Sequence, residues 1–443
     1  MSELTEHKKL YDSVFDLIEK HDKWMQNTIN LIASENVSSP AVRSAIVCDF
    51  RDRYAEGWPG ERVYAGCKYI DEVELICIDL AKKLFNAEFA DVRPISGVVA
   101  NLAMYTAAMD PGERMMALSI AHGGHISHAR KDLGGTAGQI RGHKVRNWVF
   151  DDEEFNIDVD ASIDLIRKLH GRGDEIKFLL FGGSVFPFPH PVKEFRGIAD
   201  EYGMTIGYDS AHVSGLIAAG RFQDPFGEGA DIVTASTHKT MPGPQHGIVL
   251  AKEEFAEAIK RASFPGLLSN HHLHNVAGLA VVLAEMMEFG VEYMDQILKN
   301  AKALAQALHE RGWSVIGEHK GFTESHVILV DVTETPMKDG SVVEEELEDA
   351  NIIINRNLLP WDKKRGRDYR SPGGIRLGTS ELTRLGMKGS EMDAVAEFMT
   401  RLVMKGEKKE KIAADVSEFR KDYQKVHYAF DTETDAYAHL RFM

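Results

Sequence analysis

The sequence predicts an α/β protein with a mostly parallel central sheet flanked by helices, a smaller α/β C-terminal domain and an N-terminal helical arm. Between about residues 80 and 290, short β-rich runs alternate with helix-like stretches, which is typical of a largely parallel sheet covered on both faces. The chain has 443 residues, 44% of them hydrophobic and 27% charged, an ordinary globular balance. One core seldom serves a chain of this length, so two domains are expected.

Residue patterns place the individual elements of the first two thirds of the chain. Apolar side chains at helical spacing in the first 25 residues predict an amphipathic helix laid over something larger. The β-rich runs predict strands over 114–119, 177–181, 204–208, 231–236 and 247–251. Helices are expected between them, over 98–108, 161–170 and 192–202.

The C-terminal third shows weaker patterns. Two helices are predicted over 277–290 and 297–311, the second stopped by Gly312. A strand is predicted over 326–333, a surface loop over 361–374 and a solvated helix face over the charge run KGEKKEK at 405–411. We therefore expect a domain boundary near residues 285–295, and divide the chain into an arm (1–40), a large domain (41–288) and a small domain (289–443).

Composition limits the classes of partner. The formal net charge of −16 argues against a nucleic acid, because phosphate backbones are bound by surplus Lys and Arg. The N-terminus has no apolar signal core, and about 18 uninterrupted apolar residues, as a membrane span requires, occur nowhere. Three cysteines without paired spacing fit a reducing compartment. We expect a cytoplasmic protein with a small-molecule ligand.

Several common sites are absent from the sequence. No P-loop, full dinucleotide-binding fingerprint, zinc-protease motif or serine-hydrolase elbow occurs. Two histidine groups, His122 with His125 and His128, and His271 with His272 and His274, lack a cysteine or carboxylate that would complete a ligand set. Hydrogen-bonding or packing roles are favoured for both groups, and no metal is expected.

Three features point to chemistry at one edge of the predicted sheet. Lys239 follows a β-rich run and could form a Schiff base with an aldehyde, although a lone lysine there is usually a surface residue. Asp209 ends the preceding run, and could pair with a pyridine nitrogen or cap the next helix. Ser96 and Gly97 precede a helix and could bind phosphate or serve as a cap.

Together these features resemble the serine hydroxymethyltransferase family, pyridoxal phosphate (PLP) enzymes of the aspartate aminotransferase fold type, and its archaeal branch in particular. The resemblance covers about residues 25–400. It rests on several long motifs in one order, which are LIASEN (31–36), RYAEG (53–57) with Pro59-Gly60, YIDEVE (69–74), AHGGH (121–125), DSAH (209–212), STHKT (236–240) and GIRLGT (374–379).

The resemblance implies a role for each matching residue. Lys239 would hold PLP, Asp209 would pair with its ring nitrogen and His125 would stack on its ring. The phosphate would lie against Ser96, Gly97, Ser236 and His238, and the 3′-oxygen near Ser184 and His212. The substrate carboxylate would be bound by Arg376 with help from Ser34. Tyr54, Glu56 and Tyr64 would reach the site from the neighbouring subunit of a homodimer; the alternative for Glu56 is an ion pair with Arg53 or Arg62.

The implied reaction is reversible transfer of the serine hydroxymethyl group to a tetrahydropterin, either tetrahydrofolate or tetrahydromethanopterin, which leaves glycine. The alternative is a pterin-independent PLP aldolase or transaldolase acting on threonine-like or α-methyl β-hydroxy amino acids. Three departures from the common family pattern bear on this choice: Val98 in place of a serine, Gln245-His246 in place of Arg-Gly, and the segment 265–272 in place of a glycine-rich phosphate loop.

Overall fold

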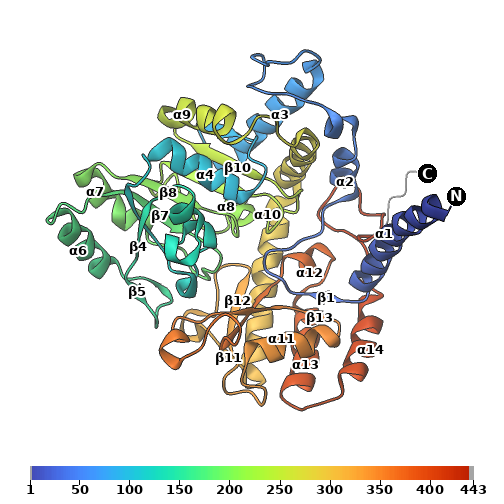
Figure 1. Cartoon of the computed structure of the whole chain (residues 1–443). Helices are drawn as coiled ribbons and strands as arrows, with labels where there is room; N and C mark the ends of the chain where they lie inside the picture. Colours follow the sequence, from blue (N-terminus) through green and yellow to red (C-terminus); the bar gives the residue numbers. More distant parts are fainter. Residues whose placement is uncertain (1, 439–443) are drawn as a thin grey trace.

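The computed structural model describes residues 2–438 and contains one large, mostly parallel sheet (Figure 1). The seven strands of this sheet are Phe89–Asp91 (β2), Arg114–Ala117 (β3), Lys144–Asn147 (β4), Ile176–Gly182 (β7), Thr205–Asp209 (β8), Ile232–Ser236 (β9) and Gly247–Ala251 (β10). Their order is β2-β10-β9-β8-β7-β3-β4, and every pairing is parallel except those that β10 makes with β9 and β2. The predicted fold class and all five predicted strands of this sheet are confirmed.

Helices cover both faces of the large sheet. In β7, Phe178 and Leu180 pack into one core, and Leu179 and Phe181 into the other, because successive side chains of a strand point to opposite faces. The first core is closed by Gly97–Ala108 (α4), Thr136–Gln139 (α5) and Ala256–Arg261 (α9). The second is closed by Lys68–Phe85 (α3), Val159–His170 (α6), Val192–Tyr202 (α7) and Ser214–Ala218 (α8).

A smaller antiparallel sheet lies in the C-terminal part. Its strands are Ser314–Val315 (β11), Val327–Asp331 (β12), Asn355–Asn357 (β14) and Gly374–Gly378 (β15), in the order β11-β12-β15-β14. Helices Gly340–Asp349 (α11), Ser380–Arg384 (α12), Gly389–Val403 (α13) and Lys409–Arg420 (α14) follow its strands. Short pairings join Ile29–Asn30 (β1) to Ile352–Ile353 (β13), and Phe150–Asp151 (β5) to Asn156–Ile157 (β6).

One helix, Leu273–Glu310 (α10), runs through both parts of the chain for 38 residues. The prediction of two separate helices over 277–290 and 297–311 is therefore wrong. A glycine inside a helix costs about 1 kcal/mol, but Tyr293 and Met294, within the turn that follows Gly290, are buried in the core of the large sheet. Residues up to Ile297 belong to that core, and residues from Ala301 onward belong to the core of the small sheet. Packing on both sides keeps the helix continuous.

The helix predicted for the first 25 residues is confirmed as Ser2–Gln26 (α1). Its apolar stripe does not pack on the body of the same chain, since Leu10 and Leu17 are each 63% exposed and Val14 is 54% exposed. The helix projects from the rest of the molecule (Figure 1). A further short helix, Pro40–Ile46 (α2), follows the loop after β1.

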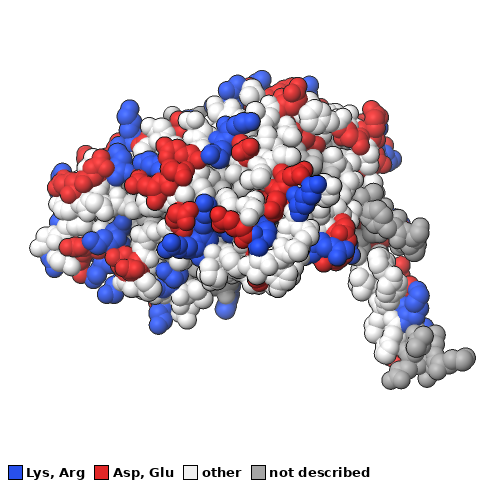
Figure 2. All heavy atoms as spheres, turned by 90° about the horizontal axis from the view of Figure 1, so that it is seen from above, with Lys and Arg blue, Asp and Glu red and all other residues white. Residues whose placement is uncertain are grey.

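Two predictions on the polar segments have different outcomes. The surface loop over 361–374 is confirmed, apart from one helical turn at Lys363–Arg365. The charge run 405–411 is not a single helix face: Gly406 has a φ of +65°, and only the last residues of the run belong to α14. Acidic and basic side chains are interspersed over the face shown in Figure 2. Among residues 2–438, no helix combines the length and apolarity needed to cross a bilayer.

Candidate active site

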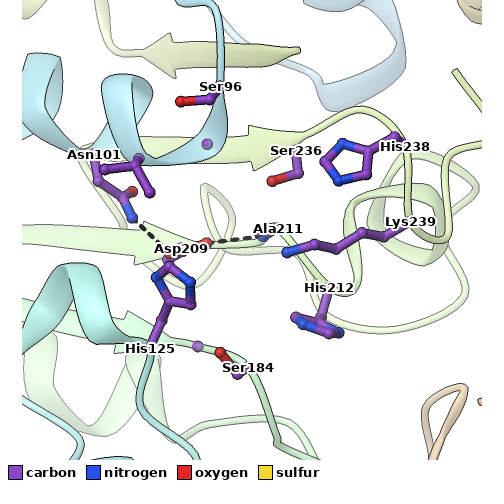
Figure 3. A pocket seen from close by; sticks show the side chains of 13 residues that line it. Ser96, Asn101, His125, Ser184, Asp209, Ala211, His212, Ser236, His238 and Lys239 are labelled. Atoms are coloured by element: carbon purple, nitrogen blue, oxygen red, sulfur yellow. Dashed lines mark hydrogen bonds between the residues drawn. The ribbon is translucent and has the colours of Figure 1, made fainter. Parts of the chain in front are cut away.

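A cavity of about 180 Å³ lies at the carboxyl ends of β7, β8 and β9, beside the N-terminus of α4 (Figure 3). This is the sheet edge at which α/β proteins bind ligands. The structure brings together here every residue that the sequence predicts for cofactor binding. The lining residues are Ser96, Gly97, Val98, Asn101, His125, Gly183, Ser184, Asp209, Ala211, His212, Ser236, His238 and Lys239.

Lys239 lies in the loop that follows β9, and its amine points toward Asp209 and Ala211 (Figure 3). Its backbone is held by the Asn36 side chain, whose Nδ2 donates to the Lys239 carbonyl oxygen over 2.6 Å. Burial, helped by the positive charge of Arg376 and opposed by Asp209, lowers the pKa of the Lys239 amine to about 8. The neutral amine, which is the form that attacks an aldehyde, is therefore populated at a much lower pH than that of an exposed lysine, and reaches one half near pH 8.

Asp209 is the last residue of β8 and is held by three hydrogen bonds. Its Oδ2 accepts from Asn101 Nδ2 (2.8 Å) and lies 2.7 Å from His128 Nε2, and its Oδ1 accepts from the Ala211 N–H (2.9 Å). Burial alone would raise the pKa of this carboxyl, but the interactions with His128, His125 and Asn101 outweigh it and hold the pKa well below its ordinary value. The cavity floor therefore carries a permanent negative charge.

The opposite end of the cavity is suited to an anion. Ser96 caps α4 by accepting from the Val99 N–H over 3.2 Å, and the first N–H groups of the helix face this end of the cavity. A Cβ on Gly97 would lie 2.5 Å from Ser236 Oγ, so a larger residue at position 97 would displace this hydroxyl from its place beside the helix N-terminus. The hydroxyls of Ser96 and Ser236 and the His238 ring line the same cavity and offer further polar groups to an anion.

The side walls of the cavity carry neutral imidazoles. The His125 Nδ1 lies 2.7 Å from Ser127 Oγ, and burial lowers the pKa of His125 to about 4. The His212 ring is buried and stacks on the His326 ring, with centroids 5.7 Å apart and planes 20° apart. Burial likewise holds the pKa of His212 well below its ordinary value. Neutral rings can lie against an apolar ring face without adding charge to the site.

The two residues predicted to bind a substrate carboxylate lie beside this cavity and do not line it. Arg376, on β15, donates to Asn355 Oδ1 (3.1 Å) and to the Ser184 carbonyl oxygen (3.2 Å), and burial lowers its pKa to about 10. Ser34 lines an adjoining cavity of about 560 Å³, which shares His238 with the first. Arg376 thus reaches the site from the small sheet, and Ser34 from the loop after β1.

Tyr54, Glu56 and Tyr64 do not line the cavity of the chain that carries them. Tyr54 and Tyr64 are 44% and 46% exposed, their rings lie 4.9 Å apart, and Tyr54 Oη lies 3.1 Å from Ser269 Oγ. The alternative reading of Glu56 as an ion-pair partner is not supported within residues 2–438, because Arg53 pairs with Asp49 and Arg62 pairs with Asp71 and Glu74.

Sequence reasoning missed three contributors to the site: Asn101, His128 and the Ala211 N–H. Asn101 follows Gly97 by one helical turn, so the helical period alone could have placed it on the same side of α4. His128 was singled out only as a member of a histidine group, because nothing in the sequence pairs it with Asp209. Among residues 2–438, no group of three or more His, Cys, Asp and Glu side chains is arranged to hold a metal ion.

Three residues that depart from the family pattern lie at different places relative to the two cavities. Val98 lines the cavity at its anion end. Gln245 is exposed and lines the adjoining cavity. His246 does not line either cavity: its ring is fully buried, and its Nε2 lies 2.7 Å from the Val92 carbonyl oxygen. The ring added at this position therefore packs beneath the site and not against a ligand.

Comparison with known proteins agrees with this geometry. The family model for serine hydroxymethyltransferase matches residues 8–399. This chain belongs to the serine hydroxymethyltransferase family. It is 54% identical to the serine hydroxymethyltransferase of Nitrosopumilus maritimus over 437 residues, which cover 99% of each chain. It is 55% identical to that of Cenarchaeum symbiosum, covering 98% of each, and 54% identical to that of Methanocaldococcus jannaschii, covering 96% of this chain and 97% of the relative.

Serine hydroxymethyltransferases interconvert serine and glycine with PLP as cofactor and a tetrahydropterin as co-substrate, and this chain is such an enzyme. The residues of the cavity fit PLP. Lys239 offers an amine of lowered pKa, Asp209 offers a buried carboxylate, and α4 offers its N-terminus, where Ser96 and Gly97 line the cavity. These groups match an aldehyde, a protonated ring nitrogen and a phosphate, which are the three functional ends of PLP.

Proposed function

We propose that serine and glycine are interconverted at the cavity around Lys239. The observation that carries this proposal is the placement of a lysine amine of lowered pKa across from a buried carboxylate, beside an anion-binding helix N-terminus. Lys239 would hold PLP through its amine, and Asp209 would pair with the ring nitrogen of the cofactor. The residues that would bind its phosphate are Ser96, Gly97, Ser236 and His238. His125 would contact the ring, and Ser184 and His212 the 3′-oxygen.

We propose that Arg376 and Ser34 bind the amino-acid substrate. The planar guanidinium of Arg376 can hold a carboxylate through two parallel hydrogen bonds, which fixes the direction of the bond to be broken. When bound, PLP supplies an electron sink for the electron pair released from that bond. Glu56 moves the proton of the β-hydroxyl, since a carboxyl near a reacting oxygen serves as general acid or base.

We propose that the enzyme is a homodimer with active sites shared between subunits. In one chain, Tyr54, Glu56 and Tyr64 lie outside the cavity, although the family motifs give them substrate roles. The apolar stripe of α1 is exposed in the single chain, as are Leu75 and Ile76 on α3. A second copy would cover such apolar side chains and supply the missing catalytic groups.

We propose the domain division predicted from the sequence: an arm (1–40), a large PLP-binding domain (41–288) and a small domain (289–443). The change of core along α10 supports a boundary within this helix, but places it between Ile297 and Ala301, C-terminal to residue 288. A cytoplasmic location is proposed on the cysteine usage, since Cys48, Cys67 and Cys77 are free thiols.

The decisive experiment is a steady-state assay of serine turnover with tetrahydrofolate, with tetrahydromethanopterin and without pterin. We expect glycine formation to depend on one of the two pterins, whose identity the assay gives. The altered segments 243–247 and 265–272 make the acceptor the feature most in need of this test. Rapid pterin-free cleavage of threonine or α-methylserine, with no pterin stimulation of serine turnover, would instead establish the aldolase alternative.

A further inference from the structure

His128 is a buried histidine that no step of the proposed reaction uses. It ends a short helical turn, Ile126–His128, and its side chain is fully buried. It does not line the cavity, yet its Nε2 lies 2.7 Å from Asp209 Oδ2. Its Nδ1 has no hydrogen-bond partner among the described residues. Within residues 2–438, the Asp209 carboxylate is therefore the only hydrogen-bond partner of this ring.

The contacts of Asp209 leave one defined position for a further donor. A carboxylate offers about four lone-pair directions, two on each oxygen. His128 and Asn101 occupy both directions of Oδ2, and the Ala211 N–H occupies one direction of Oδ1. One direction on Oδ1 therefore remains for a ligand N–H, and the three donors together prevent the carboxylate from rotating.

Asn101, the other donor to Asp209 Oδ2, is itself held in place by hydrogen bonds. Asn101 Oδ1 accepts from Thr234 Oγ1 over 2.6 Å, and Asn101 Nδ2 also donates to Ser127 Oγ over 2.9 Å. Ser127 Oγ in turn lies 2.7 Å from His125 Nδ1. The turn that carries His128 thus links the carboxylate at the cavity floor to the ring on its wall.

We propose that His128 is a positioning residue for the cofactor: its Nε2–H fixes the Asp209 carboxylate so that a single Oδ1 direction faces the ring nitrogen of PLP. This inference rests on the proposed role of Asp209 and extends it to a residue outside the cavity. Removal of the His128 donor frees Oδ2 to turn toward the cavity, and leaves a buried carboxylate with one charge-assisted hydrogen bond fewer.

The test compares His128→Leu with His128→Gln, which keeps an N–H donor close to the Nε2 position. We expect His128→Leu to raise the dissociation constant of PLP about 10- to 100-fold, the worth of one hydrogen bond to a charged group, and to shift the absorbance maximum of the lysine-bound cofactor. The Gln variant should restore both the affinity and the spectrum to near wild-type values. PLP affinity is measured by equilibrium titration of the apoenzyme, and thermal unfolding of each apoenzyme reports its stability.

His143→Leu is the matched control for losing a buried imidazole. His143 is 3% exposed, packs on Tyr105 and is not among the residues that line the cavity. It should leave the PLP affinity and spectrum unchanged. A Leu variant of His128 with wild-type affinity and spectrum would overturn the inference, as would a Gln variant as impaired as the Leu variant.

Asp209→Asn separates this inference from the function on which it rests. If Asp209→Asn weakens PLP binding and His128→Leu does not, only the role of His128 is wrong. If Asp209→Asn also leaves the affinity and spectrum unchanged, the proposed role of Asp209 fails as well. Should His128→Leu not fold, His128→Asn, whose amide is too short to reach Oδ2, gives the same comparison with His128→Gln.

Discussion

The cavity around Lys239 and the loop over residues 53–67 both carry residues expected to act on the substrate, but they are built in opposite ways. In the cavity, Asp209 and His212 are each 3% exposed, and the carboxylate of Asp209 is held by three hydrogen bonds within the chain. In the loop, the backbone is fixed while Tyr54 and Tyr64 point outward and are nearly half exposed.

The loop is rigid because Arg62 is buried beneath it. The guanidinium of Arg62 donates to the Ala55 and Gly57 carbonyl oxygens and pairs with Asp71 and Glu74 on α3. Breaking a buried ion pair by removing one partner costs about 3–5 kcal/mol. A loop held this firmly, with its aromatic side chains exposed, is a preformed surface for another molecule. The residues expected to bind the cofactor all line one cavity within a single chain, whereas we propose that a second copy completes the substrate end of the site.

Loss of Lys239 tests the role of the cavity and has the largest expected effect. Lys239→Ala removes the only amine that lines the cavity among residues 2–438, so we expect serine turnover to fall by about 10³-fold or more. Borohydride reduction followed by peptide mass analysis should label residue 239 of the wild-type holoenzyme. Lys177→Ala, an exposed lysine paired with Glu175, is the control and should be fully active. Labelling at another lysine would contradict the assignment.

Arg376 lies on the small sheet beside the cavity and donates to the carbonyl oxygen of Ser184, which lines it. Arg376→Lys keeps the positive charge but cannot form two parallel hydrogen bonds with a carboxylate. We expect kcat/KM for serine to fall about 100-fold, as for loss of one charge-assisted hydrogen bond together with orientation, and PLP affinity to stay unchanged. Arg356→Lys on the adjacent strand β14 is the matched control. Equal losses in both variants would show that the sheet, and not the substrate contact, is affected.

The pKa of Lys239 predicts how the apoenzyme captures PLP. Because burial and Arg376 lower this pKa from 10.5 to about 8, the amine is protonated and unreactive below pH 8 and neutral above it. The initial rate of PLP capture should rise about 50-fold from pH 6 to pH 8 and level off above pH 9. Stopped-flow absorbance measures this rate. Arg376→Gln removes a nearby cation and should move the inflection to higher pH; a rate still rising tenfold per unit at pH 9 would exclude the lowered pKa.

The sequence predicts the residues that line the cavity better than it predicts the tertiary contacts that hold them in place. Lys239, Asp209 and Ser96 follow or precede regular elements, and the carboxyl ends of parallel strands meet at one edge, so local pattern suffices to bring them together. The hydrogen bond from His128 to Asp209 depends on how a loop closes, and no local pattern encodes it. The continuity of α10 through Gly290 is likewise decided by the two cores that it joins, because tertiary packing overrides a local propensity of about 1 kcal/mol.

Hybrid dimers test whether the loop over residues 53–67 acts in the active site of the other subunit. This prediction has the smallest expected effect. If Glu56 acts in the partner's site, a dimer of one Lys239→Ala chain and one Glu56→Gln chain contains one site with both residues intact and one site with neither. Two inactive parents should then give a hybrid with about half the wild-type activity per dimer, measured after co-expression with two affinity tags. Were Glu56 to act within its own chain, each site of the hybrid would lack one residue and activity would stay at the level of the parents. Recovery of activity therefore depends on Lys239 and Glu56 of different chains meeting at one substrate.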